Sequence, residues 1–229
     1  AGIISLNAPG TPVEEPMRRI VISNQKGGVA KTTTAVNLAT GLGMIGQRTL
    51  LIDVDPQSNA TFAVLGEEPE TNSTYDLIIK DVALGQTIRH TTRPNLDIVP
   101  SNIDLAGAEI ELISKVGGQT RLRTKLNEAL EGLPYDFIVI DAPPSLGFLT
   151  INALAASEEV LIPVPASIFA LNGMQRLEET IMLVRRELAC PNLRINGVIC
   201  TMYENTNMAK DVRAEITRHF GQLVFGTTI

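Results

Sequence analysis

A loop rich in glycine and lysine carries the strongest chemical signal in the sequence. Residues 24–33 read Asn-Gln-Lys-Gly-Gly-Val-Ala-Lys-Thr-Thr, after the apolar run Ile20–Ile22 and at the start of a helical stretch. Glycines let backbone N–H groups turn toward phosphate oxygens, and the helix N-terminus adds its dipole. This order predicts a nucleotide site in which Lys31 contacts the β- and γ-phosphates and the Thr32 hydroxyl binds Mg²⁺.

Carboxylates at two apolar strand ends complete the candidate chemistry. The apolar run Leu50–Ile52 leads into Asp53-Val54-Asp55-Pro56-Gln57, and Phe137–Ile140 is followed directly by Asp141. Alternation places Asp53 and Asp55 on one side of their strand, and the carboxyl edge of a parallel sheet is where ligands bind. Such carboxylates hold Mg²⁺ or orient an attacking water, although an Asp-Pro turn that caps a helix would leave the same pattern.

The loop departs from the standard pattern G-x-x-x-x-G-K-[ST], because Gln25 and Ala30 replace both glycines and an extra lysine, Lys26, precedes Gly27 and Gly28. The result, x-K-G-G-x-x-K-[ST], is the deviant Walker A signature, and here the sequence resembles the ParA/MinD family of P-loop ATPases. The resemblance runs from about Arg19 to Ile229, and the DPQ segment favours the ParA/Soj branch.

The resemblance implies roles for individual residues. Lys26 would reach the ATP of a partner subunit, Lys31 would contact the bound phosphates, and Asp55 would orient the attacking water, so these three are the expected catalytic residues. Asp53, Asp141 and Thr32 would lie near the metal, and the Ala142–Ser145 segment is similar to the family's second switch. The expected nucleotide-binding residues are Lys26, Gly27, Gly28, Val29, Ala30, Lys31, Thr32 and Thr33.

The elements that must position these residues alternate between strand and helix. Strands are expected at 19–23, 49–54, 96–100, 137–141, 159–164, 195–201 and 223–227. Helices are expected at 31–44, 104–115, 119–131, 147–156, 172–188 and 208–220, with a short one near 75–79 in the turn-rich segment 66–95. This alternation with apolar strands predicts an α/β fold: a doubly wound, mostly parallel sheet covered by helices on both faces.

Composition narrows the class of protein. The 229 residues carry 19 basic and 25 acidic side chains, a net charge of −6 that excludes a uniformly basic nucleic-acid coat. Two cysteines, Cys190 and Cys200, form neither a disulfide framework nor a zinc pattern. We expect a flexible tail over residues 1–16, which has no signal-peptide pattern, and a single ATPase domain over residues 17–229 that stops before the family's C-terminal helix.

The resemblance also implies a function and partners. A ParA-type protein is an ATPase that segregates DNA: with ATP and Mg²⁺ it forms a homodimer, binds double-stranded DNA without sequence preference, and hydrolyses ATP slowly until a ParB-like partner stimulates it. It positions a chromosome or plasmid cargo and is cytoplasmic and nucleoid-associated, with no membrane partner. Candidate DNA contacts are Lys210, Arg213 and Arg218, although a merely solvated helix face has the same pattern.

Other functions remain open at this stage. A MinD-like positioning ATPase would act at a membrane or other surface through a C-terminal amphipathic helix. A nitrogenase iron protein would need cluster cysteines where this chain has none, and an amidoligase or dethiobiotin-synthase type would lack the Lys26 signature. A purely structural nucleotide-binding module would show no ATPase activity even with partner and DNA.

Overall fold

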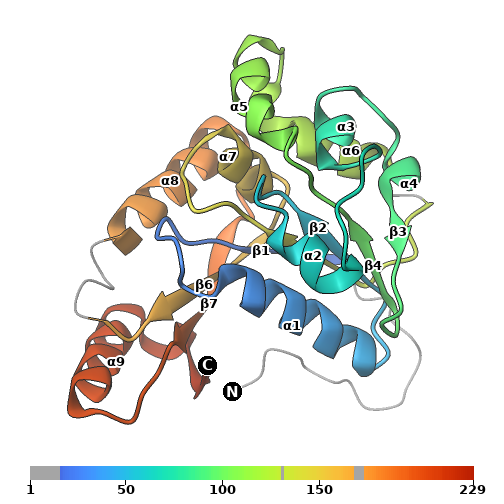
Figure 1. Ribbon diagram of the computed structural model, residues 1–229. Coiled ribbons are helices and arrows are strands. Elements are labelled where there is room, and N and C mark those ends of the chain that lie inside the picture. The colour runs from blue at the N-terminus through green and yellow to red at the C-terminus, as the bar shows by residue number, and fades with distance from the viewer. Residues whose placement is uncertain (1–15, 130–131, 168–172) are drawn as a thin grey trace.

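A single eight-stranded sheet runs through the computed structural model, which describes residues 16–129, 132–167 and 173–229 (Figure 1). The strand order is β3-β4-β2-β5-β1-β6-β7-β8. Every neighbouring pair is parallel except β3 with β4 at one edge. The predicted fold class, a doubly wound and mostly parallel α/β sheet, is therefore confirmed, while the expected tail at residues 1–16 falls almost wholly outside the described residues.

The strands and helices occupy these ranges. The strands are β1 (Arg18–Ile22), β2 (Thr49–Asp53), β3 (Arg89–His90), β4 (Leu96–Val99), β5 (Phe137–Asp141), β6 (Glu159–Pro165), β7 (Arg194–Thr201) and β8 (Val224–Thr228). The α-helices are α1 (Lys31–Met44), α2 (Asn59–Leu65), α3 (Thr74–Ile78), α4 (Leu84–Thr87), α5 (Leu105–Ser114), α6 (Arg121–Glu128), α7 (Phe148–Ala155), α8 (Met174–Glu187) and α9 (Asn207–Phe220).

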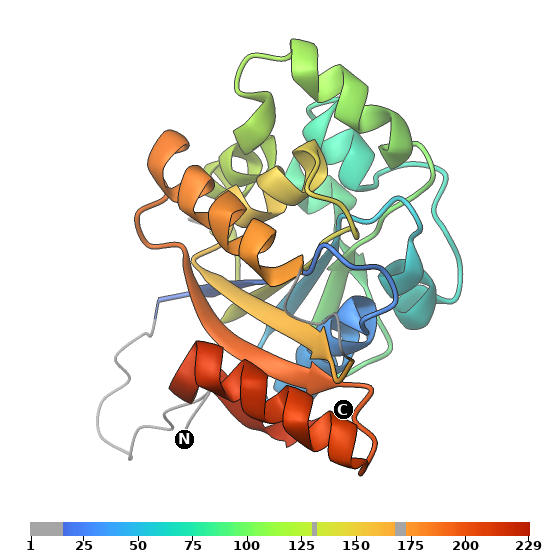
Figure 2. The ribbon, with the colours of Figure 1, turned by 90° about the vertical axis from the view of Figure 1, so that its left-hand side faces the viewer.

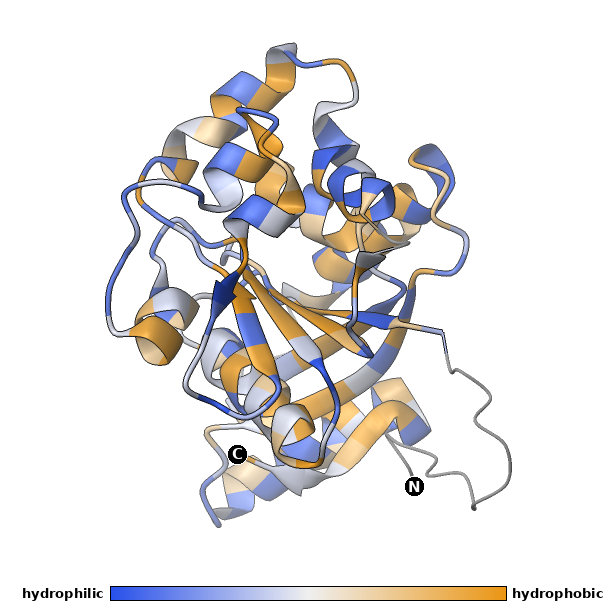
Figure 3. Ribbon diagram, turned by 90° about the vertical axis from the view of Figure 1, so that its right-hand side faces the viewer, coloured by the Kyte–Doolittle hydropathy of each residue, from blue (hydrophilic) through white to orange (hydrophobic). Residues whose placement is uncertain are grey.

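Helices cover both faces of the sheet because successive strand side chains point to opposite sides. In β1, Ile20 and Ile22 join a core with the buried faces of α1 and α2, whereas Val21 joins the larger core under α3, α5, α6, α7, α8 and α9. Figure 3 shows the strands as an apolar layer between helices whose outer faces are more polar. Strands that are buried on both sides explain the nearly continuous apolar runs in the sequence.

Helix α1 lies unusually close to the turn before β4, and a glycine makes this possible. A Cβ atom at Gly43 would lie 2.2 Å from the backbone oxygen of Pro94, a distance that no side chain tolerates. The Asn95 side chain donates a hydrogen bond of 3.0 Å to the Gly43 carbonyl. This contact fixes the C-terminal end of α1 to the sheet. Because α1 is a single helix, its N-terminal turn is held in place as well.

The expected elements are found within one or two residues of their predicted bounds, with three differences. The predicted helix 119–131 is a 3₁₀ turn at Gly118–Thr120 followed by α6, and residues 130–131 lie outside the description. Helix α2 and the short pair α4 and β3 were not predicted. Helix α2 depends on side-chain bonds to β2, and two-residue strands are too short to show a periodicity.

Candidate functional site

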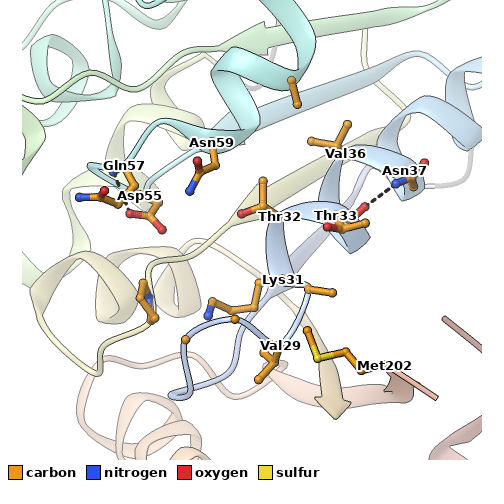
Figure 4. Close-up of a pocket in the computed structure, with 15 residues that line it drawn as sticks. Val29, Lys31, Thr32, Thr33, Val36, Asn37, Asp55, Gln57, Asn59 and Met202 are labelled. Carbon is orange, nitrogen blue, oxygen red and sulfur yellow. Dashed lines mark hydrogen bonds between the residues drawn. The ribbon is translucent and has the colours of Figure 1, made fainter. Parts of the chain in front are cut away.

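A cavity of about 660 Å³ opens at the carboxyl ends of β1 and β2, where the phosphate-loop pattern lies (Figure 4). Seven of the eight predicted nucleotide-binding residues, those from Gly27 to Thr33, line it. Figure 4 shows Asp55 and Gln57, which follow β2, on the other side of the cavity from Lys31 and Thr32. The remaining lining residues are Val36, Asn37, Asn59, Ala63, Pro144 and Met202. The predicted loop and the first predicted switch therefore share one cavity.

The loop bends through two residues in the left-handed backbone region. Gly28 has φ = +68° and Ala30 has φ = +64°, and Ala30 leads directly into α1. Glycine adopts this region freely, but a Cβ atom costs roughly 1–2 kcal/mol there. The structure thus shows why the standard motif has glycine where this chain has Ala30, and also that the bend forms with alanine.

Two buried side chains from outside the motif hold the loop. Asn24 donates to the carbonyl of Pro163 on β6 at 2.7 Å and accepts from the Lys26 backbone N–H at 3.0 Å. The Thr201 hydroxyl, at the end of β7, donates to the Val29 carbonyl at 3.1 Å. We did not predict either role, because Thr201 lies 172 residues from its partner and only the sheet brings them together.

Lys31 is the buried cation of the site, with 6% of its surface exposed. Its ammonium donates to the backbone carbonyl of Lys26 at 2.9 Å. Burial lowers the pKa of Lys31, and the nearby carboxylates of Asp141 and Asp55 raise it again in part. A lysine held among carboxylates in this way presents a fixed positive charge to an anionic ligand.

Asp141 ends β5 as a fully buried carboxylate whose oxygens have no hydrogen bond of normal geometry from the described residues, although the Thr32 side chain lies close enough to stabilise its charge. Burial is the main reason that its pKa is raised well above the usual value, with a further contribution from Asp53, while Thr32 and Lys31 counteract this. A buried carboxylate with so little hydrogen bonding is costly unless a cation compensates it. The residues present therefore fit a Mg²⁺ ion held near Thr32 and Asp141.

Asp53 and Asp55 are both buried but differ in their partners. Asp53 accepts from the backbone N–H and hydroxyl of Thr61 at 2.9 and 2.7 Å, and from the Asp55 N–H at 3.1 Å. Asp55 lines the cavity, and one of its oxygens accepts from the Gln57 N–H at 2.9 Å. Asp53 thus fixes the start of α2 and the backbone of Asp55, so the geometry gives it a positioning role behind the cavity rather than a place in its lining.

No described group of three or more His, Cys, Asp or Glu side chains is placed to hold a metal ion. Magnesium in nucleotide sites is typically bound by one or two protein groups together with water and substrate phosphates.

The candidate DNA contacts lie on α9, away from this cavity. Lys210 and Arg218 are exposed, whereas Arg213 is partly buried, donates to the Gly226 carbonyl at 3.0 Å and lies over the Tyr203 ring at 5.9 Å. Arg213 therefore ties α9 to β8.

Among the described segments, no helix has both the length and the apolar content to span a membrane.

Comparisons with known proteins agree with this geometry. A family model described as an AAA domain matches residues 17–195. The chain is similar to the sporulation initiation inhibitor protein Soj of Bacillus subtilis, at 45% identity over 92% of this chain and 83% of that protein. It is also similar to the chromosome partitioning protein ParA of Caulobacter vibrioides, at 43% identity over 93% and 80% of the two chains.

A similar solved structure contains a bound nucleotide and a metal ion. It is the cobyrinic acid a,c-diamide synthase of Mycobacterium smegmatis with bound ADP and magnesium, at 35% identity and a TM-score of 0.85, covering 93% of this chain and 86% of that one. These ligands agree with the expected ATP or ADP and Mg²⁺. Taken together with the phosphate loop and the buried Asp141, the matches show that this chain belongs to the ParA family of partition ATPases.

Proposed function

We propose that the chain is an ATP-dependent DNA segregation ATPase. In this proposal Mg²⁺ and ATP drive a homodimer, and the dimer binds double-stranded DNA of the nucleoid without sequence preference. A ParB-like partner then stimulates slow hydrolysis, and the cycle positions a chromosome or plasmid cargo. The relatives named as partition proteins support this assignment at the level of the family.

The observation that carries the proposal is the way Lys26 is held. Its backbone N–H donates to the Asn24 side chain at 3.0 Å, and its carbonyl accepts from the Lys31 ammonium at 2.9 Å. Lys26 is nevertheless exposed, and it does not line the phosphate-loop cavity of its own subunit. A lysine with a fixed backbone and a free side chain at the rim of a phosphate site is suited to complete the site of a second subunit, as an arginine finger does.

The other site residues would act on the bound nucleotide. Mg²⁺, held near Thr32 and Asp141, would neutralise phosphate charge when bound. Lys31 would bind the phosphates, and the backbone N–H groups from Gly27 to Thr33 would orient them. Asp55, fixed by Asp53 and by the Gln57 N–H, would hold the attacking water at a carboxylate oxygen.

Binding to DNA would depend on Lys210 and Arg218, because both are exposed and no described residue forms an ion pair with either. Arg213 would support the surface by holding α9 against β8. A net charge of −6 makes a single subunit a poor DNA ligand, so the dimer would be needed to double the local basic charge. Such binding is driven by phosphate contacts and must weaken as salt rises.

The test is ATP-dependent DNA binding across a salt series, with wild type beside Lys26→Ala and the matched surface variant Lys80→Ala. We expect wild type and Lys80→Ala to bind DNA only with ATP and Mg²⁺, and less tightly as salt increases. Lys26→Ala should bind ATP but not DNA. DNA binding by Lys26→Ala equal to that of wild type would overturn the link between the trans lysine and DNA capture.

The second candidate function is that of a MinD-like ATPase that acts at a membrane. One further assay distinguishes it from the DNA-segregation ATPase. Co-sedimentation with anionic liposomes and with DNA, each with and without ATP, distinguishes the two surfaces directly. We expect ATP-dependent recovery with DNA and none with liposomes. The opposite result would replace the DNA-segregation proposal with the membrane one.

A further inference from the structure

Helix α5 exposes large apolar side chains at the outer edge of the molecule. Ile103, Ile110, Ile113 and Val116, on α5 and its two flanks, are 63, 76, 67 and 100% exposed. In both Figure 1 and Figure 2, α5 lies at the upper end of the molecule and projects from the body of the fold. Contiguous exposed apolar surface of this kind usually marks a site of association.

The exposed residues form one continuous face. Positions 103, 106, 107, 110, 113 and 114 follow the spacing of a single helix face and carry Ile, Ala, Gly, Ile, Ile and Ser, so none of them is charged. The opposite side of α5 is buried through Leu105, Ala108 and Leu112. Helix α5 is therefore apolar on two sides, and only the inner side is covered by its own chain.

We infer that this face binds the same face of a second copy of the chain, with the two α5 helices antiparallel about a twofold axis between Glu109 and Ile110. Antiparallel pairing places the small residues Ala106 and Gly107 opposite Ile113 of the second copy, and Ile103 opposite its Val116. Ile113 then packs against small residues, whereas Ile110 packs against its own symmetry mate and Ile103 against Val116. A twofold axis requires this kind of self-complementary surface.

Charge supports the second copy as the occupant. Asp104 and Lys115 lie on the same flank of the apolar face, eleven positions apart, so antiparallel pairing brings Asp104 of one copy to Lys115 of the other at both ends. No described residue forms an ion pair with Asp104 or Lys115 within one chain. Glu111, on the same flank, accepts a 2.9 Å hydrogen bond from the Tyr75 hydroxyl within its own chain.

The pairing is proposed for the chain without nucleotide, so it can be tested apart from the proposed function. None of the residues on the α5 face lines the nucleotide cavity. The contact involves one short helix from each copy, which places it among small and weak interfaces. We therefore expect reversible association at high micromolar concentration without nucleotide.

The first test is sedimentation velocity of the full chain without nucleotide over a concentration series. Asp104→Lys and Lys115→Asp should each weaken self-association at least about fivefold, because each places like charges opposite each other at both ends of the pair. The double variant Asp104→Lys with Lys115→Asp restores both pairs and should return the affinity to within about threefold of wild type. A monomeric wild type, or a double variant as weak as the single ones, would refute the pairing.

The second test does not depend on charge. Ile110→Cys places a thiol next to its own symmetry mate, whereas the native Cys190 and Cys200 are buried. Under mild copper phenanthroline oxidation Ile110→Cys should form a covalent dimer quickly, and the control Met208→Cys, on the half-exposed Met208 of α9, should not. Equal rates for the two variants would show random collision and refute the pairing, and would leave the α5 face to a different protein.

Discussion

Replacing Thr201 by valine tests whether the end of β7 sets the shape of the phosphate loop. The Thr201 side chain is fully buried, and its hydroxyl donates to the Val29 carbonyl at 3.1 Å, on the loop that lines the nucleotide cavity. Valine has almost the same shape but no donor. The substitution therefore removes one hydrogen bond and leaves the buried Val29 carbonyl without it, while packing changes little.

The size of the effect follows from the cost of an unsatisfied buried acceptor, about 1–3 kcal/mol. Part of this lowers the free energy of unfolding. The rest weakens nucleotide binding. Without the Thr201 hydroxyl the loop turns so that water can hydrate the Val29 carbonyl, and it must turn back to present its N–H groups to the nucleotide. If about 1.4 kcal/mol falls on binding, the affinity for Mg²⁺-ADP drops about tenfold.

Isothermal titration calorimetry with Mg²⁺-ADP measures the affinity, and urea unfolding measures the stability. Thr201→Ser is the matched control, since serine keeps the hydroxyl and loses only a methyl group. We expect Thr201→Val to bind roughly 5- to 30-fold more weakly and Thr201→Ser to bind within about threefold of wild type. If Thr201→Val binds ADP as tightly as Thr201→Ser, the hydroxyl does not shape the loop and the reasoning fails.

Three further predictions concern charged groups of the site. Lys31→Ala should weaken Mg²⁺-ATP binding on the order of 100-fold, because it removes the buried cation that faces the phosphates; calorimetry showing unchanged affinity would exclude the phosphate-loop assignment. Asp55→Ala should bind ATP normally but lower turnover on the order of 10²- to 10⁴-fold, and normal phosphate release would remove its assigned role. Burial raises the pKa of Asp53 from 3.8 to about 6, so the fold favours its protonated form; that stabilisation is complete below pH 3.8 and is lost as pH rises through 6. From pH 4 to 7 wild type should therefore lose about 2 kcal/mol more unfolding free energy than Asp53→Asn, and equal pH profiles in urea unfolding would contradict the assignment.

The local elements were predictable because their signals are local. The turn residues, lysines and threonines of residues 24–33 stand next to one another, and they predict a phosphate loop before any fold is known. Strand and helix periods likewise extend over neighbouring residues, so nearly every predicted element is found within two residues of its bounds. The same reasoning placed Asp55 at the cavity and Asp141 at the end of a buried strand.

The sequence could not show what each side chain touches. Asp53 and Asp55 look equivalent in the chain, yet Thr61 takes up the carboxylate of Asp53 and leaves Asp55 at the cavity. Arg213 reads as a free cation on an amphipathic helix, but the Gly226 carbonyl accepts its hydrogen bond. Partners of this kind depend on which strands lie side by side.

The amino-acid order by itself thus determined the family, the phosphate loop and the sequence of strands and helices, because each depends on residues that are close along the chain. Tertiary structure alone decided that Thr201 and Asn24 hold the loop, that the Asp141 carboxylate is fully buried, and that one face of α5 is uncovered. The physical reason is that burial and hydrogen bonding are set by neighbours in space, and the parallel sheet brings together residues that lie up to 172 positions apart.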